Sequence, residues 1–215
     1  MSSIKLSPNA SGTGAFTIAA PNSNTDRTLT LPDATGTSVL DTASQTLTNK
    51  TLGSGLVMGA SAITAGTVVA STSGTSIDFT SIPSWVKRVT VMFSGVSTSG
   101  SSVIQIQIGT SGGFQTTGYL GSYGYGQNPS ANLTTGFGIY NDGATDVLHG
   151  SSTINLLNSS TGIWTFSSLL GWSSRAYQLP SAGSKTLSGT LDRVRITTVN
   201  GTDTFDAGSI NILWE

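Results

Sequence analysis

The sequence contains no cysteine, a single histidine (His149) and a single glutamate (Glu215) among its 215 residues. Without cysteine, neither disulfides nor a cysteine-based metal site can stabilise the fold, so the core and any assembly must do so. Glutamate and lysine are common helix formers on exposed surfaces, and their scarcity argues against an all-helical fold. Ser and Thr instead supply 67 residues and Gly 27, a composition typical of short strands joined by tight turns.

Charge and long apolar runs are also scarce. Nine basic and ten acidic side chains give a formal net charge of -1, which provides no electrostatic footprint for direct binding of nucleic acid. No window approaches the roughly 20 apolar residues of a membrane span, and the start of the chain lacks the apolar run of a secretory signal. We therefore expect synthesis in a cytoplasm, no membrane insertion, and export only with a carrier such as a virion.

Aromatic residues are nearly absent from the first third of the chain. Of the 16 Phe, Tyr and Trp residues, only Phe16 precedes Phe79. Because aromatic burial offsets much of the entropy lost on folding, residues 1–74 are poorly equipped to form a core alone. Short β-like runs at 15–19 and 27–31 precede a Gly-rich connector at 53–74, so we predict an extended attachment and trimerisation segment with a linker.

Residues 75–215 show the alternation of half-buried strands. Ile104, Ile106 and Ile108 alternate with Gln105 and Gln107, and similar runs recur up to the last residues of the chain, which suggests a C-terminus locked into a sheet. Turn sequences such as NDG at 141–143 and NG at 200–201 separate these runs. This spacing predicts an antiparallel β-sandwich, with a jelly roll as the favoured topology and another Greek-key arrangement as the alternative.

Within this domain, the shared parity of four large apolar residues predicts one buried face of a strand. These residues are Trp164, Phe166, Leu170 and Trp172. The order of the strands cannot be derived from the alternation.

Two phrases in the first part of the chain resemble a known class of protein. Residues 28–40 (TLTLPDATGTSVL) and 43–52 (ASQTLTNKTL) resemble segments that recur in tail fibres and other appendage proteins of tailed bacteriophages, especially those of aquatic bacteria. Residues 85–91 (WVKRVTV) and 206–215 (DAGSINILWE) look like the small β-sandwich heads of such proteins. The chain is shorter than typical long fibres and has no shaft repeats, so a short fibre, a head fibre and a decoration protein fit about equally well.

The resemblance implies a virion structural protein, usually a homotrimer. Its N-terminal part would attach to other virion proteins of the capsid, portal or tail, and its C-terminal head would face outward to bind host surface polysaccharide. A capsid decoration (cement) protein, forming trimers on the head surface, is the alternative function. A polysaccharide-degrading tailspike is a weaker alternative.

The most suggestive binding segment is the loop at residues 119–129 (YLGSYGYGQNP). Flat tyrosine rings can stack on the apolar faces of a sugar, and neighbouring amide groups can form hydrogen bonds with its hydroxyls. The sequence therefore predicts a glycan or receptor loop, against the simpler role of packing over the sandwich. Its residues are Tyr119, Tyr123, Tyr125, Gln127 and Asn128. Gln105 and Gln107 could also read glycans, although a polar strand face in solvent is the simpler interpretation.

Support for catalysis or metal binding is weak. A serine triad needs a histidine base, and His149 lies at the expected start of a strand, so we predict no catalytic residues. The aspartates mostly occupy turns rather than the opposed positions that a glycosidase needs. No cofactor is expected, although residues 141–146 (NDGATD) and 203–206 (DTFD) carry oxygen ligands at short spacing and leave calcium open.

Overall fold

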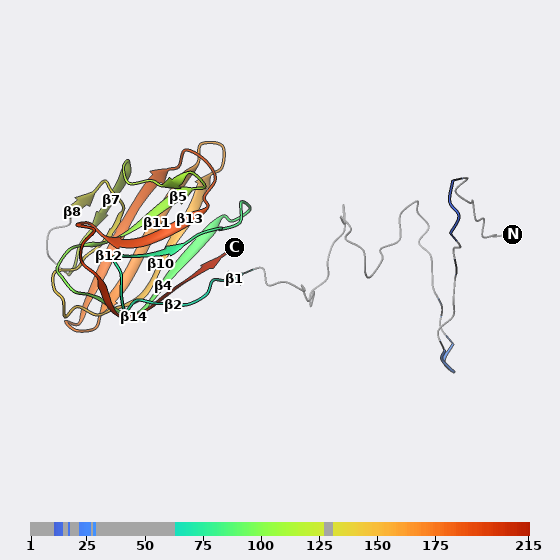
Figure 1. Ribbon diagram of the computed structural model, residues 1–215, viewed down its shortest axis with the longest axis horizontal. Helices are drawn as coiled ribbons and strands as arrows, with labels where there is room; N and C mark the ends of the chain where they lie inside the picture. The colour runs from blue at the N-terminus through green and yellow to red at the C-terminus, as the bar shows by residue number, and fades with distance from the viewer. Residues whose placement is uncertain (1–10, 15–16, 18–21, 27, 29–62, 127–130) are drawn as a thin grey trace. The chain divides into compact units, whose positions relative to one another are not determined.

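The computed structural model describes residues 11–14, 17, 22–26, 28, 63–126 and 131–215 (Figure 1). The chain divides into two units, Met1–Ser54 and Gly55–Glu215. In the first unit the described residues form exposed turns, bends and loop, where the amide of Thr25 donates to Ser23 Oγ at 3.1 Å. The predicted attachment and trimerisation segment falls mostly on residues outside the described ranges.

The second unit is an all-β antiparallel sandwich, as the sequence predicts. Its described residues form strands, turns and loops without a helix, so none of them forms a helix able to cross a membrane. The larger sheet has nine strands among these residues, in the spatial order β1, β14, β4, β10, β11, β12, β7, β8, with β2 also paired to β14. Their bounds are Thr64–Ala65 (β1), Val69–Ala70 (β2), Arg88–Thr98 (β4), Tyr119–Tyr123 (β7), Ala131–Leu133 (β8), Leu148–Asn158 (β10), Ile163–Trp172 (β11), Tyr177–Thr186 (β12) and Phe205–Trp214 (β14).

The smaller sheet has the order β3, β13, β5, β6, with β9 also paired to β5. Its strands are Ser76–Phe79 (β3), Ile104–Thr110 (β5), Gly113–Phe114 (β6), Phe137–Ile139 (β9) and Arg193–Thr198 (β13). The last two long strands, β13 and β14, pair with β5 and β4 in different sheets, whereas β10, β11 and β12 form a consecutive meander. This order depends on pairings between distant parts of the chain, which the alternation does not specify.

The core lies between the sheets and follows the predicted alternation. Trp164 and Phe166 are each 3% exposed, and Leu170 and Trp172 are buried on the same face of β11, which confirms the predicted buried parity. Phe166 stacks on Phe137 of β9 with ring centroids 4.5 Å apart, so the two sheets meet through an aromatic pair.

The prediction that Gln105 and Gln107 form a polar strand face in solvent, or read glycans, is wrong. They are 4% and 5% exposed because residues 135–136 lie against them. Thr135 Oγ1 donates to Gln105 Oε1 at 2.9 Å, and Gln107 Nε2 donates to the Thr135 carbonyl at 2.9 Å. Alternation shows which side of a strand is polar, but not whether another segment covers that side.

Part of the expected connector is strand. Within residues 53–74 the structure describes Ile63 onward, and β1 and β2 pair with β14. The amide of Ser71 then donates to the carbonyl of Gly208 at 2.9 Å. Residues 63–71 thus follow the edge of the larger sheet, and Figure 1 shows β1 beside the C-terminus.

The sandwich has two ends that the strand register defines. At the end called proximal here, Thr64 of β1 pairs with Trp214, which pairs with Val89 of β4. At the opposite, distal end, Trp172 closes β11 and pairs with both Leu148 of β10 and Tyr177 of β12. The described part of the sandwich therefore begins at the proximal end, and the β11–β12 turn lies at the distal end.

Candidate functional site

Four of the five tyrosines of the chain gather around Trp172 at the distal end. Tyr125 is the centre of this group, which we call the aromatic cluster, with ring centroids 4.2 Å from Tyr140, 5.6 Å from Trp172 and 5.7 Å from Tyr177. Tyr123 joins it at 6.4 Å from Tyr140. Trp172 is buried, Tyr177 is 47% exposed and the other three rings are partly exposed. The cluster therefore has a buried base and an accessible outer surface.

The first part of the expected tyrosine loop, residues 119–123, is strand β7 rather than loop, and glycines bring it and the residues after it against their neighbours. The amide of Gly124 donates to the Pro180 carbonyl at 3.2 Å, which holds the loop beside β12. Tyr123 lies over Gly138, where a Cβ atom would come within 2.4 Å of Tyr123 Cδ1. Only a residue without a side chain leaves room for the ring at that position.

A strained turn presents the next part of the cluster. Ala176 has φ = 56°, a left-handed conformation that residues other than glycine rarely adopt, and it stands between Arg175 and Tyr177. The amide of Arg175 donates to the Trp172 carbonyl at 3.2 Å. Strain of this kind persists where surrounding contacts hold the turn, as the rings on both sides do here.

Arg175 crosses the cluster and is neutralised by two carboxylates. Its guanidinium carbon lies 4.5 Å from the centre of the Trp172 ring. Its Nη2 is 2.9 Å from Asp142 Oδ1, and its Nε is 3.2 Å from Asp146 Oδ1, whose side chain is fully buried. Both carboxylate oxygens lack a well-aligned hydrogen bond, so their contact with Arg175 is mainly ionic. With two negative charges around one positive charge, this region does not favour an anionic ligand.

Tyr140 joins the rings to this charged group. Its hydroxyl donates to Asp142 Oδ2 at 3.3 Å. Burial raises the pKa of Tyr140, and the neighbouring Tyr125 and the Asp142 carboxylate raise it further. The hydroxyl of Tyr140 is therefore held in its neutral form, as a hydrogen-bond donor.

The structure separates the predicted loop residues into three groups. Tyr123 and Tyr125 lie in the aromatic cluster. Tyr119 is fully buried, edge-on to Phe137 at 4.9 Å, and its hydroxyl accepts from the Ile108 amide at 2.8 Å. Burial raises the pKa of Tyr119, and its enclosed ring belongs to the core rather than to an exposed binding loop.

The remaining two predicted loop residues, Gln127 and Asn128, lie outside the described residues. Four members of the site were missed by the sequence reasoning. They are Tyr140, Trp172, Arg175 and Tyr177. The sequence predicts only a core position for Trp172, and no local motif marks the other three, because the contacts that unite them come from segments far apart in the chain.

Three of the four candidate calcium-binding carboxylates have protein partners. In residues 141–146 both carboxylates contact Arg175, and the amide of Asp142 donates to Asp146 Oδ2 at 3.1 Å. Asp203 accepts from the Ser102 amide at 3.0 Å and from Asn200 Nδ2 at 2.8 Å. Among the described residues, no three His, Asp or Glu side chains converge as a metal site. Calcium binding stays a prediction, and at residues 141–146 it would have to compete with Arg175.

His149 lies at the start of β10, as expected, and its Nδ1 accepts a hydrogen bond from the Gly95 amide at 3.2 Å. This contact joins β10 to β4. It assigns the Nδ1 lone pair to the backbone, so any proton on the neutral ring is carried by Nε2.

The aromatic cluster offers stacking surfaces with polar groups at their edges, which is the chemistry of a site for neutral polyhydroxylated ligands. Comparison with known proteins provides no counterpart: no family model, curated protein or solved structure matches the chain.

Proposed function

We propose that this chain is a structural protein of a bacteriophage particle, a fibre-type appendage whose sandwich binds host surface glycan at the aromatic cluster. The phage assignment rests on the resemblance of residues 28–52 to appendage proteins. The glycan assignment rests on the chemistry of the distal end of the sandwich.

One observation carries the binding proposal. Four of five tyrosines, with Trp172 and Arg175, meet at the end opposite to Thr64, where the described sandwich begins. Loops at one end of a rigid sandwich are a common location for binding residues.

The ligand would be a neutral sugar unit. A pyranose ring has an apolar face that can pack on Tyr177 or Tyr125, while Tyr140 and Arg175 supply polar groups nearby. Because Arg175 is compensated by Asp142 and Asp146, the cluster has no free cation to attract a carboxylate or phosphate.

Assembly as a homotrimer is part of the same proposal. Leu120 and Leu169 are 73% and 58% exposed on the larger sheet, apolar surface that contact between subunits could cover. Light scattering of the full chain should give three times the mass of one chain. A monomer at all concentrations would contradict the trimer.

Binding is tested with glycans released from the host surface and the purified full chain. Tyr177→Ala should weaken binding about tenfold, equivalent to roughly 1.4 kcal/mol, because one exposed stacking ring is lost. Trp85→Ala is the matched control, since Trp85 is 52% exposed and outside the cluster. Equal binding by both variants, or no binding to host cells or their glycans, would overturn the assignment.

The location in the particle is tested by counting copies in a particle reconstruction. A fibre-type appendage occurs in a few copies, whereas a decoration protein forms a stoichiometric array on the shell. Release of reducing sugar from host polysaccharide would instead favour a degrading tailspike.

A further inference from the structure

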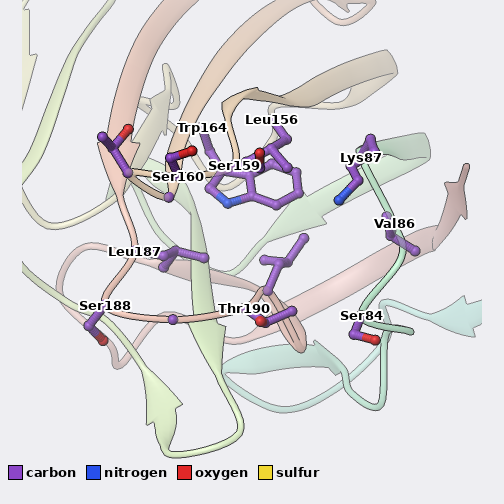
Figure 2. Close-up of a pocket in the computed structure, with 14 residues that line it drawn as sticks. Ser84, Val86, Lys87, Leu156, Ser159, Ser160, Trp164, Leu187, Ser188 and Thr190 are labelled. Carbon is purple, nitrogen blue, oxygen red and sulfur yellow. The ribbon is translucent and has the colours of Figure 1, made fainter.

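A pocket of about 370 Å³ opens at the proximal end, away from the aromatic cluster (Figure 2). It lies between the segment that precedes β4, the β10–β11 turn and the segment that follows β12. Its volume is in the lower part of the range of small-molecule sites. None of the cluster's rings lines it.

The pocket combines an apolar floor with many hydroxyls. Trp164 and Leu187 contribute to the floor, and Figure 2 shows the edge of the Trp164 indole that carries the ring nitrogen turned toward the space between the loops. Six hydroxyl side chains surround this floor: Ser84, Ser159, Ser160, Thr161, Ser188 and Thr190. Trp164 and Leu187 are only 3% and 4% exposed, so the pocket has a small apolar floor within a rim of hydroxyls, which suits a polyhydroxylated ligand such as a sugar.

The charge of the pocket differs from that of the aromatic cluster. Among the described residues that line it, Lys87 is the one charged side chain and none is a carboxylate. The neighbouring charges are already paired, because Arg88 contacts Glu215 and Arg193 contacts Asp192. Among the described residues, Lys87 makes no ion pair. Figure 2 shows its ammonium on the side that faces the Trp164 indole.

We infer that this pocket binds a saccharide unit that carries a carboxylate, such as a uronic acid. The sugar ring lies above the small apolar floor of Trp164 and Leu187, its hydroxyls bond to the surrounding serines and threonines, and its carboxylate pairs with Lys87. The positive charge of Lys87, uncompensated within the pocket, favours an acidic sugar over a neutral one. This site does not depend on the aromatic cluster or on its proposed ligand.

The probes are oligosaccharides of galacturonate, glucuronate and mannuronate, each compared with the neutral oligomer of the parent sugar. Titration of the full chain, followed by calorimetry and by the Trp164 indole N–H resonance, should show binding of at least one acidic oligomer. That oligomer should bind about tenfold more tightly than its neutral counterpart. If none of the three binds at millimolar concentration, or if neutral oligomers bind equally well, the inference is overturned.

Single-residue variants test whether Lys87 contacts the acidic sugar directly. Lys87→Gln should reduce affinity about tenfold, while Lys87→Arg should retain most of it. Arg88→Gln is the matched control, since it removes one positive charge beside the pocket from a residue that does not line it. Equal losses for Lys87→Gln and Arg88→Gln would contradict a direct contact with Lys87.

Two further variants keep the test independent of folding and of the proposed function. Thr190→Val removes a hydroxyl from an exposed residue and should weaken binding several-fold, without the folding risk of truncating Trp164. Tyr177→Ala should leave binding of the acidic oligomer unchanged. Loss of that binding in Tyr177→Ala alone would assign the acidic sugar to the aromatic cluster and overturn the inference for the pocket.

Discussion

The two ends of the sandwich differ in how their rings and charges are arranged. At the distal end, rings from four segments of the chain pack on one another and Arg175 is compensated by Asp142 and Asp146. At the proximal end, loops surround a pocket in which Lys87 makes no ion pair with any described residue. The same hairpin, β10–β11, reaches both ends. Thus one framework can carry a surface suited to neutral sugars and a pocket suited to an acidic one.

The residues of the two ends should also differ in how much they contribute to stability and to binding. The cluster's charges and rings support each other, so several of its residues should contribute to folding as well as to recognition. Lys87 makes no ion pair among the described residues, so its removal should affect binding more than folding.

The largest expected effect on stability comes from truncating a side chain of the core, which lies between the two sheets. Phe166→Ala should lower the free energy of unfolding by about 3–5 kcal/mol, because it leaves a cavity opposite Phe137 between the sheets. Chemical denaturation at one protein concentration measures the change. Leu157→Ala, at a 67% exposed position of β10, is the control and should cost far less. Equal stability of the Phe166 variant and wild type would contradict the described core.

A smaller loss of stability should distinguish the charged group of the distal end. Arg175→Ala should cost roughly 1–3 kcal/mol, because it leaves the buried Asp146 carboxylate without its cation, although the exposure of Arg175 moderates the effect. Arg195→Ala is the comparison, since its pair with Asp78 is about one-third exposed and should contribute only about 0–1 kcal/mol. A loss no larger for Arg175 than for Arg195 would show that the distal charges are independent of folding.

Alkaline pH should lower the stability of the fold through the ionisation of two tyrosines. The folded state raises the pKa of Tyr119 and Tyr140 above the ordinary value of 10.0. Above pH 10 the unfolded chain loses these protons first, so stability that is fully present below pH 10 should decline as pH rises. Urea denaturation between pH 9 and 11 measures the decline, and tyrosinate absorbance reports the ionisation.

Tyr140→Phe removes one of these two groups and should make the decline shallower. Tyr177→Phe is the control. A decline equally steep in Tyr140→Phe and wild type would show that Tyr140 does not contribute to it.

The smallest expected effect concerns the strained turns. Among the described residues, Ser81 and Ala176 are the non-glycine residues with positive φ, at 62° and 56°. Ala176→Gly should raise stability by up to about 1 kcal/mol, because relief of left-handed strain slightly exceeds the added freedom of the unfolded chain. Ser81→Gly offers the same test at the other end, and thermal melting compares the two. Destabilisation by Ala176→Gly would mean that the alanine methyl group makes a contact worth more than the strain.

Much of the fold could be predicted because strand alternation is local. The parity of Trp164 and Phe166 predicted their burial, and the many Ser, Thr and Gly residues predicted a sandwich without helices in the described part. Local alternation failed for Gln105 and Gln107, whose polar side is covered by residues 135–136.

The sites were less predictable because their members are distant in the chain. The tyrosine motif led to Tyr123 and Tyr125, yet it also included Tyr119, which is fully buried. Tyr119 and Tyr123 share one parity in β7, so alternation does not distinguish the fully buried ring from the partly exposed one.

The sequence by itself determined the fold class, the parity of the strands and the uneven distribution of aromatic residues, since these follow from composition and near-neighbour pattern. The contacts of Tyr125 with Tyr140, Trp172 and Tyr177, and the place of Lys87 in a pocket whose described lining includes no carboxylate, came from the tertiary structure alone. The physical reason is that strand order and loop packing arise from pairings between remote segments, and these pairings decide which side chains share a surface.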